Sequence, residues 1–170
     1  MNQIKVIEIK KQKTLQIIKF IILLGIASLL PAVVHNQIIT GSVINATLFL
    51  AVLTLDIQSA ILIGLIPSIV ALSVGLLPAP LAPMIPFIMF ANSLLIIVFN
   101  WLKERNYWLG VIVASLIKFL FLFGASSIVI NLLLKQELAS KVSIMMSWPQ
   151  LATAIIGGII AFGVYKIVKK

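Results

Sequence analysis

Six long apolar runs make up most of this chain, and each is close to the length that crosses a bilayer as a helix. A spanning helix needs about 20 mainly apolar residues. Of the 170 residues, 62% are hydrophobic and 10% are charged, whereas soluble domains carry about 25% charged residues. The chain is therefore predicted to be an all-α integral membrane protein, with a basic segment over residues 1–14 and a single six-helix transmembrane domain over residues 15–170.

The boundaries of the spans follow from charged residues and prolines. The predicted spans are Leu15–Val34, Ile38–Leu55, Ser59–Leu77, Met84–Leu102, Trp108–Leu134 and Pro149–Lys166. Between spans three and four, the prolines from Pro78 to Pro83 cannot continue a helix. The segment Lys135–Trp148, before the last helix, is short, amphipathic and too polar to cross. A secretory signal peptide is the alternative for the first run, but no clear small-x-small cleavage site follows it.

The distribution of basic residues predicts the orientation. Of the 13 Lys and Arg, ten lie on the side of the two termini, Lys135 and Lys141 lie on the other side, and Lys118 lies within a span. Cytoplasmic loops of membrane proteins carry the excess of Lys and Arg. Both termini are thus predicted to be cytoplasmic, in a multi-pass protein of the cell membrane. The net charge of +9 is then a topology signal, and no nucleic-acid partner is expected.

Little in the sequence suits catalysis. Cysteine is absent, the acidic residues number four, and the one histidine, His35, falls on the opposite side of the membrane from Asp56. No Gly-x-x-x-x-Gly-Lys-Ser/Thr loop is present to hold the phosphates of a nucleotide. We therefore expect no enzymatic activity, metal site or cofactor, and any active transport would draw its energy from other subunits.

Polar side chains within the spans gather in the half away from the termini, where burial in lipid is costly and such residues usually face the bundle or a cavity. From the helix rise, Asn45 lies about 10 Å and Asn92 about 12 Å below the outer ends of their spans, with Lys118 near mid-depth. The candidate solute-binding residues are His35, Asn36, Gln37, Asn45, Asn92, Lys118, Ser127, Asn131, Trp148, Gln150 and Thr153. They predict an outward-facing pocket in which Lys118 meets an anionic or carbonyl-bearing solute.

These residues also have structural alternatives. Asn45 and Asn92 can simply hydrogen-bond between helices, which is worth about 0.6 kcal/mol on average. A lysine near mid-membrane costs about 2.5–3.5 kcal/mol, although its long stem can carry the ammonium of Lys118 to the inner interface. His35 can be an ordinary loop residue, and the proline-rich stretch either a stiff connection or a wall of the pocket.

The outer loops carry a more specific pattern. It comprises His35-Asn36-Gln37-Ile38-Ile39-Thr40-Gly41, then Gly75-Leu76-Leu77-Pro78-Ala79-Pro80-Leu81-Ala82-Pro83-Met84-Ile85-Pro86-Phe87, and Met146-Ser147-Trp148-Pro149-Gln150-Leu151. Over about residues 15–165 the chain resembles small bacterial membrane proteins grouped with the substrate-binding S components of energy-coupling-factor (ECF) transporters. None of the loops copies a known vitamin pocket.

The resemblance implies a six-helix protein that binds a vitamin or similar micronutrient from outside. It also implies three partners, namely a transmembrane T subunit and two cytoplasmic ATPases. Family members dock the T subunit through an Ala-x-x-x-Ala stretch in the first helix. The nearest match here runs from Ser28 to Ala32, with Gly25 beside it, and lacks the alanine pair.

Two other functions compete with this one: a self-contained facilitator and a non-transporting membrane scaffold or assembly protein. A facilitator needs a path through the membrane, and the inner halves of spans two, three and six are almost purely apolar. A scaffold needs no convergent pocket, so its function should survive replacement of Asn92 and Lys118 by apolar residues.

Overall fold

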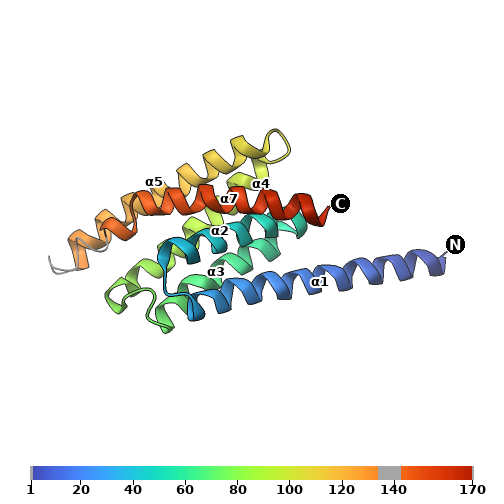
Figure 1. Cartoon of the computed structure of the whole chain (residues 1–170), viewed down its shortest axis with the longest axis horizontal. Coiled ribbons are helices and arrows are strands. Elements are labelled where there is room, and N and C mark those ends of the chain that lie inside the picture. Colours follow the sequence, from blue (N-terminus) through green and yellow to red (C-terminus); the bar gives the residue numbers. More distant parts are fainter. Residues whose placement is uncertain (1, 134–142, 170) are drawn as a thin grey trace.

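The computed structural model describes the backbone of residues 2–133 and 143–169 and, within these ranges, the side chains of all but residues 2–7, 80 and 130–133. The described chain contains α-helices and a short 3-10 helix, η1, and its elements pack into one bundle (Figure 1). The elements are α1 (Asn2–Val33), α2 (Gln37–Thr54), α3 (Ile57–Ser73), η1 (Ala79–Met84), α4 (Ile85–Leu102), α5 (Tyr107–Leu133) and α7 (Trp148–Val168).

Five segments of the described chain have the length and hydropathy of a membrane span, and they contain α1, α2, α4, α5 and α7. The remaining helix, α3, is apolar but has only 17 residues. The chain is therefore a multi-pass helical membrane protein. The prediction of six spans is confirmed by length and composition for five of them, and a sixth span over α3 stays a prediction.

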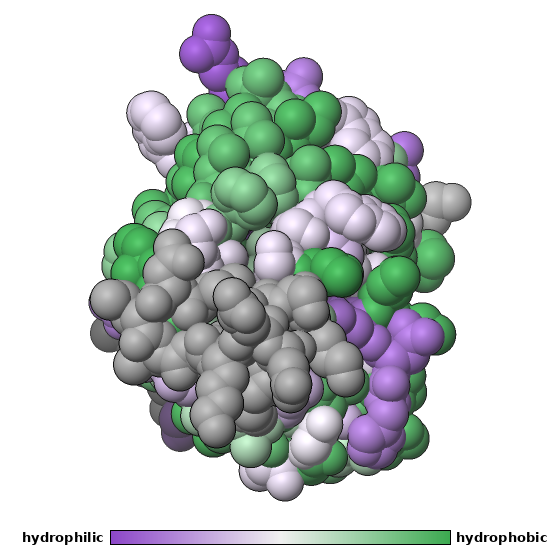
Figure 2. Space-filling model, turned by 90° about the vertical axis from the view of Figure 1, so that its left-hand side faces the viewer, coloured by the Kyte–Doolittle hydropathy of each residue, from purple (hydrophilic) through white to green (hydrophobic). Residues whose placement is uncertain are grey.

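The outside of the bundle is apolar, as a lipid-facing surface requires. Helix α5 exposes large hydrophobic side chains at helical spacing, namely Leu109, Ile112, Leu116, Leu120 and Phe123. Figure 2, which views the end of the bundle at the α1–α2 connection, shows hydrophobic residues over much of its upper part. In water an apolar side such as that of α5 would mark an interaction site, whereas here it is what the bilayer covers.

Helix α1 differs from the prediction at its start. The basic segment over residues 1–14 is largely continuous with the first span, because one helix of 32 residues begins at Asn2. At 1.5 Å per residue this helix is about 48 Å long, longer than the hydrocarbon core of about 30 Å. It projects beyond the other helices at the end of the bundle where α7 ends (Figure 1). A bilayer that encloses the bundle therefore leaves part of α1 outside.

The connection between α3 and α4 is more ordered than a loop. Helix α3 ends four residues before the predicted Leu77, because Gly75 adopts a positive φ of 76° and the Leu77 N–H donates to the carbonyl of Ala71 at 2.8 Å. This arrangement is a glycine-terminated helix end. The proline-rich residues then form η1, which buries Leu81 and Met84 against the bundle. The amphipathic segment predicted at Lys135–Trp148 lies mostly outside the described residues.

Helix α7 packs closely against two neighbours, because Gly157 faces α2 and Gly158 faces α5. A Cβ on Gly157 would lie 2.6 Å from the Cβ of Asn45, and one on Gly158 would lie 2.4 Å from Val111 on α5. The carbonyl of Gly158 also accepts a hydrogen bond of 2.7 Å from the Tyr107 hydroxyl. The small size of these two residues therefore allows close helix packing, and the close approach at Gly157 brings α7 to the polar face of α2.

Asp56 caps the N-terminus of α3 and provides a first testable prediction. Its carboxylate accepts hydrogen bonds from the Ser59 N–H at 2.9 Å and the Ser59 hydroxyl at 2.7 Å, and these bonds hold the pKa of Asp56 below its ordinary value. Loss of such a cap costs about 0.5–2 kcal/mol. Because the folded-state pKa is depressed, this contribution is present above the unfolded pKa of about 3.9 and is lost as the pH falls through the folded value.

We therefore expect Asp56→Ala to lower the thermal stability in detergent at pH 7, and the difference from wild type to shrink below about pH 4. Glu104→Ala is the matched control, because Glu104 is exposed and its side chain makes no hydrogen bond within the described chain. A difference that stays constant between pH 7 and the acid range would contradict this account of Asp56.

Candidate functional site

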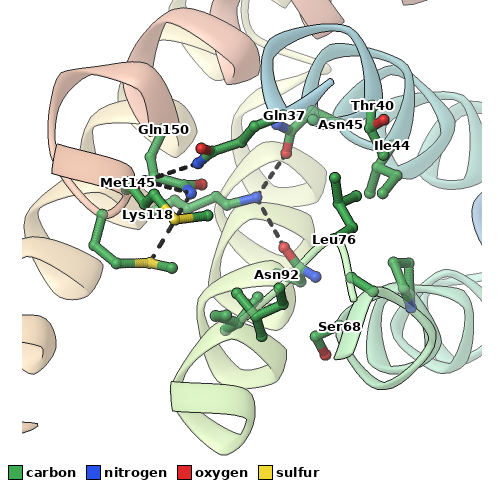
Figure 3. A pocket seen from close by; sticks show the side chains of 16 residues that line it. Gln37, Thr40, Ile44, Asn45, Ser68, Leu76, Asn92, Lys118, Met145 and Gln150 are labelled. Carbon is green, nitrogen blue, oxygen red and sulfur yellow. Dashed lines mark hydrogen bonds between the residues drawn. The ribbon is translucent and has the colours of Figure 1, made fainter. Parts of the chain in front are cut away.

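The ammonium group of Lys118 is buried in the middle of the bundle. Its side chain on α5 is 4% exposed, and Nζ donates to Oδ1 of Asn45 on α2 at 2.6 Å and to Oδ1 of Asn92 on α4 at 2.8 Å (Figure 3). The lysine therefore does not snorkel to the interface. Asn45 and Asn92 hydrogen-bond between helices, which was the structural alternative to a binding role. The group that they hold is the ammonium of Lys118.

The orientation of both asparagines is determined by contacts behind them. Asn45 Nδ2 donates to the hydroxyl of Thr153 on α7 at 3.4 Å, and Asn92 Nδ2 donates to the carbonyl of Gly64 on α3 at 2.8 Å. A lysine ammonium has donors only, so the amide oxygens must face it. Five helices thus contribute to one polar cluster around Lys118.

The charge at this cluster has no carboxylate beside it within the described chain. The sequence holds four acidic residues, and the three described ones, Glu8, Asp56 and Glu104, lie outside the cluster near the ends of helices. An ammonium has three N–H donors, of which the two asparagines accept two. The third N–H and the positive charge therefore remain available to a ligand.

A cavity of about 110 Å³ reaches this cluster from the end of the bundle opposite to the start of α1. Lys118, Asn45 and Asn92 belong to its lining, as do Gln37 and Gln150, which lie at the beginnings of their helices (Figure 3). The apolar lining consists of Gly41, Ile44, Pro67, Ala71, Leu76, Leu77, Ile88, Met145 and Met146, and Thr40 and Ser68 add two hydroxyls. The cavity is thus mostly apolar, with one cation inside it.

Two glutamines hold the chain that leads into α7. Gln37 Nε2 and Gln150 Nε2 both donate to the carbonyl of Met145, at 3.0 and 3.1 Å. These bonds link the start of α2 to the start of α7 and place Met145 and Met146 in the wall of the cavity. The side-chain amides of both glutamines therefore hold the rim of the cavity together and also make it polar.

Five of the predicted binding residues meet at the cavity. They are Gln37, Asn45, Asn92, Lys118 and Gln150. A sixth, Thr153, is buried and lies behind Asn45, where its hydroxyl accepts the amide hydrogen bond. Its contribution to the site is to orient Asn45.

The other predicted residues whose side chains the structure describes do not line the cavity. His35 is exposed, Asn36 caps α2 by accepting from the Ile38 and Ile39 N–H groups, and the exposed Ser127 bonds to the carbonyl of Phe123. Trp148 is 64% exposed at the start of α7. The side chain of Asn131 lies outside the described residues.

The sequence reasoning missed several lining residues. Thr40, Gly41 and Ile44 share one face of α2 with Gln37 and Asn45, and the helical spacing of three or four residues predicts this face once two of its members are known. Leu76 and Leu77 line the cavity directly before the proline-rich stretch, whereas no described side chain between Pro78 and Pro83 lines it.

The three residues predicted to dock a partner lie along α1. A Cβ on Gly25 would meet no atom within 4 Å, and Ala32 is exposed. The hydroxyl of Ser28 bonds to the carbonyl of Leu24 at 2.8 Å, as is common for serines inside helices. This side of α1 is therefore open in the isolated chain.

Metal ligands do not gather in the described part of the chain, where no group of three or more His, Cys, Asp or Glu side chains is found. Comparisons with known proteins identify no family for this chain. No protein-family model, no curated protein and no solved structure matches the sequence or the fold.

Proposed function

We propose that this protein is the substrate-binding S subunit of an ECF-type importer, and that it captures a vitamin or similar small micronutrient in the cavity at Lys118. The observation that carries the proposal is a cavity whose buried ammonium has one N–H donor that no described residue accepts. Placing a lysine within a membrane bundle costs about 2.5–3.5 kcal/mol, and charged residues at such positions commonly mark substrate sites.

The packing on the far side of Lys118 favours a binding subunit over a facilitator. Toward the end where α1 begins, Phe49, Leu95 and Phe99 are completely buried, and Phe49 packs edge-on against Phe99 at 4.7 Å between ring centroids. The core of large side chains there is continuous with Val111 and Ala114 on α5. A solute that enters the cavity therefore meets a packed core, and release on the other side requires a rearrangement.

The membrane orientation and the partner subunits in this proposal are inferred from the sequence. The excess of Lys and Arg on the side of the termini predicts that this side is cytoplasmic and that the cavity opens outward; this topology includes α3 as a sixth span. The resemblance to S components supplies the partners, which are a T subunit that docks near Gly25, Ser28 and Ala32 and two ATPases. Since this chain has no nucleotide-binding loop, separate ATPases would provide the energy.

Binding is tested on the protein purified in detergent, by thermal shift and native mass spectrometry against vitamins, nucleobases, carboxylates and metal ions. A ligand at a hundredfold excess over its dissociation constant raises the stability by about 2.7 kcal/mol. We expect a stabilising solute that Ala71→Phe excludes, because Ala71 lines the cavity. Ala32→Phe is the matched control, at an exposed position of α1. If no solute binds, the scaffold function replaces the proposal.

Transport is tested with the same protein in lipid vesicles. As a binding subunit, the chain alone should bind the labelled solute without equilibrating it across the membrane. Equilibration that Ala71→Phe blocks would instead show a facilitator. Co-reconstitution with a T subunit and ATPases should then give ATP-dependent uptake, and the absence of any uptake with such partners would contradict the assignment to an importer.

A further inference from the structure

We propose that the solute is a compact monocarboxylate with an apolar body, whose carboxylate accepts the free N–H of Lys118. This inference rests on the proposed function in one respect, namely that the cavity binds a solute. It adds the chemical class, and the charge, the walls and the size of the cavity each support it.

The charge of the cavity selects an anion. Among the described side chains that line it, Lys118 is the one ionisable group, and its two neighbours present neutral amide oxygens to its ammonium. A cationic solute would meet this ammonium in a low-dielectric site, where like charges repel strongly. Each asparagine amide nitrogen also has a second N–H beyond the one that it donates to Thr153 or Gly64. The cluster thus offers hydrogen-bond donors to a negatively charged group.

The lining limits that anion to a single charged group. No second lysine or arginine of the described residues lines the cavity, so a dicarboxylate or a nucleotide phosphate would bury charge without a partner among them. The walls from Ile44, Leu77 and Ile88 are aliphatic, and Met145 and Met146 add thioether side chains that adapt to irregular shapes. Such walls suit a ring or a branched chain.

The volume of the cavity limits the size of the solute. One water molecule needs about 10–15 Å³ of a cavity of this kind, so about 110 Å³ has room for about seven to eleven non-hydrogen atoms. A single ring or a branched chain of five or six carbons with a carboxylate has this size. Larger cofactors would need the cavity to widen.

The test compares ligands of the same shape and different charge on the wild-type protein. Benzoate, benzamide and benzamidine carry negative, neutral and positive charge on one scaffold, and 4-methylpentanoate with its amide forms a second, aliphatic pair. Titration calorimetry or thermal shift in detergent measures their affinities. We expect each carboxylate to bind at least about tenfold more tightly than its amide, as hydrogen bonds to charged groups allow, and benzamidine not to bind.

Variants then assign the effect to Lys118. Lys118→Met should remove the preference for the carboxylate over the amide, whereas Lys166→Met should keep it, because Lys166 stacks on Phe162 outside the cavity. The comparison of ligands on the wild type stands on its own if Lys118→Met fails to fold.

The outcomes separate this inference from the proposed function. Equal affinity for a carboxylate and its amide, or binding of neither carboxylate, overturns the inference. If another solute of the wider panel still binds and is excluded by Ala71→Phe, the proposed function stands with a different solute class. If nothing in the panel binds, both fall.

Discussion

Replacement of Asn92 by leucine is expected to destabilise the folded protein by about 1.5–3 kcal/mol, the range for hydrogen bonds to charged groups. The variant removes the oxygen that accepts from Lys118 at 2.8 Å and the amide that donates to the Gly64 carbonyl. Leucine has a similar volume to asparagine, so a cavity contributes little to the loss of stability. The loss arises because the buried ammonium of Lys118 is left with Asn45 as its one remaining described partner. Burial of a poorly compensated charge is among the most costly changes in a protein interior.

The measurement is the unfolding temperature or denaturant midpoint in detergent. Asn100→Leu is the matched control, since Asn100 lies two turns further along α4, half-buried, and its side chain makes no hydrogen bond within the described residues. The double variant Asn92→Leu with Lys118→Met should be less destabilised than the sum of the two single variants, because it removes the charge together with its partner. Additive effects would mean that the two side chains are not coupled.

Gly157→Ala is expected to lower stability by about 1–3 kcal/mol, the usual cost of an extra methyl group in a close-packed site. The new Cβ would lie 2.8 Å from the backbone N of Ala46 and 2.9 Å from the carbonyl oxygen of Ser42. These are backbone atoms, so α2 and α7 would have to separate. Alanine gains about 1 kcal/mol over glycine in helix propensity, which offsets part of this cost.

Gly163→Ala is the control on the same helix, because its Cβ would meet no atom within 4 Å. This variant should be neutral or slightly stabilised through helix propensity. Since Asn45 lies at the same contact and holds Lys118, Gly157→Ala should also weaken solute binding. Equal stability of the two alanine variants would show that the close approach of α2 and α7 does not determine the packing of this bundle.

The helices and the buried polar residues could be predicted from the sequence alone. Apolar runs near the length of a span define most of the helices within a few residues, because the bilayer requires both length and hydropathy. Lys118, Asn45 and Asn92 were identified by the cost of placing them in lipid, and all three meet in one cluster.

The sequence was a weaker guide at the ends of the helices. His35, Asn36 and Trp148 are polar or amphipathic residues of loops, and composition does not say whether such a side chain faces a cavity, a helix end or the surroundings. In the structure Asn36 caps a helix, and His35 and Trp148 are exposed. The end of α3 was also placed too late, since the positive φ of Gly75 ends a helix whose apolar pattern continues.

The sequence by itself determined that this chain is a multi-pass helical membrane protein with a lysine and several amides within its spans. Only the tertiary structure decided which amides hold it and which apolar residues enclose the cavity. The physical reason is that hydropathy and helix length are local properties, whereas the cluster depends on how helices rotate and approach one another. Here Gly157 of α7 allows α2 to come close, and that contact lets Thr153 orient the asparagine that faces Lys118.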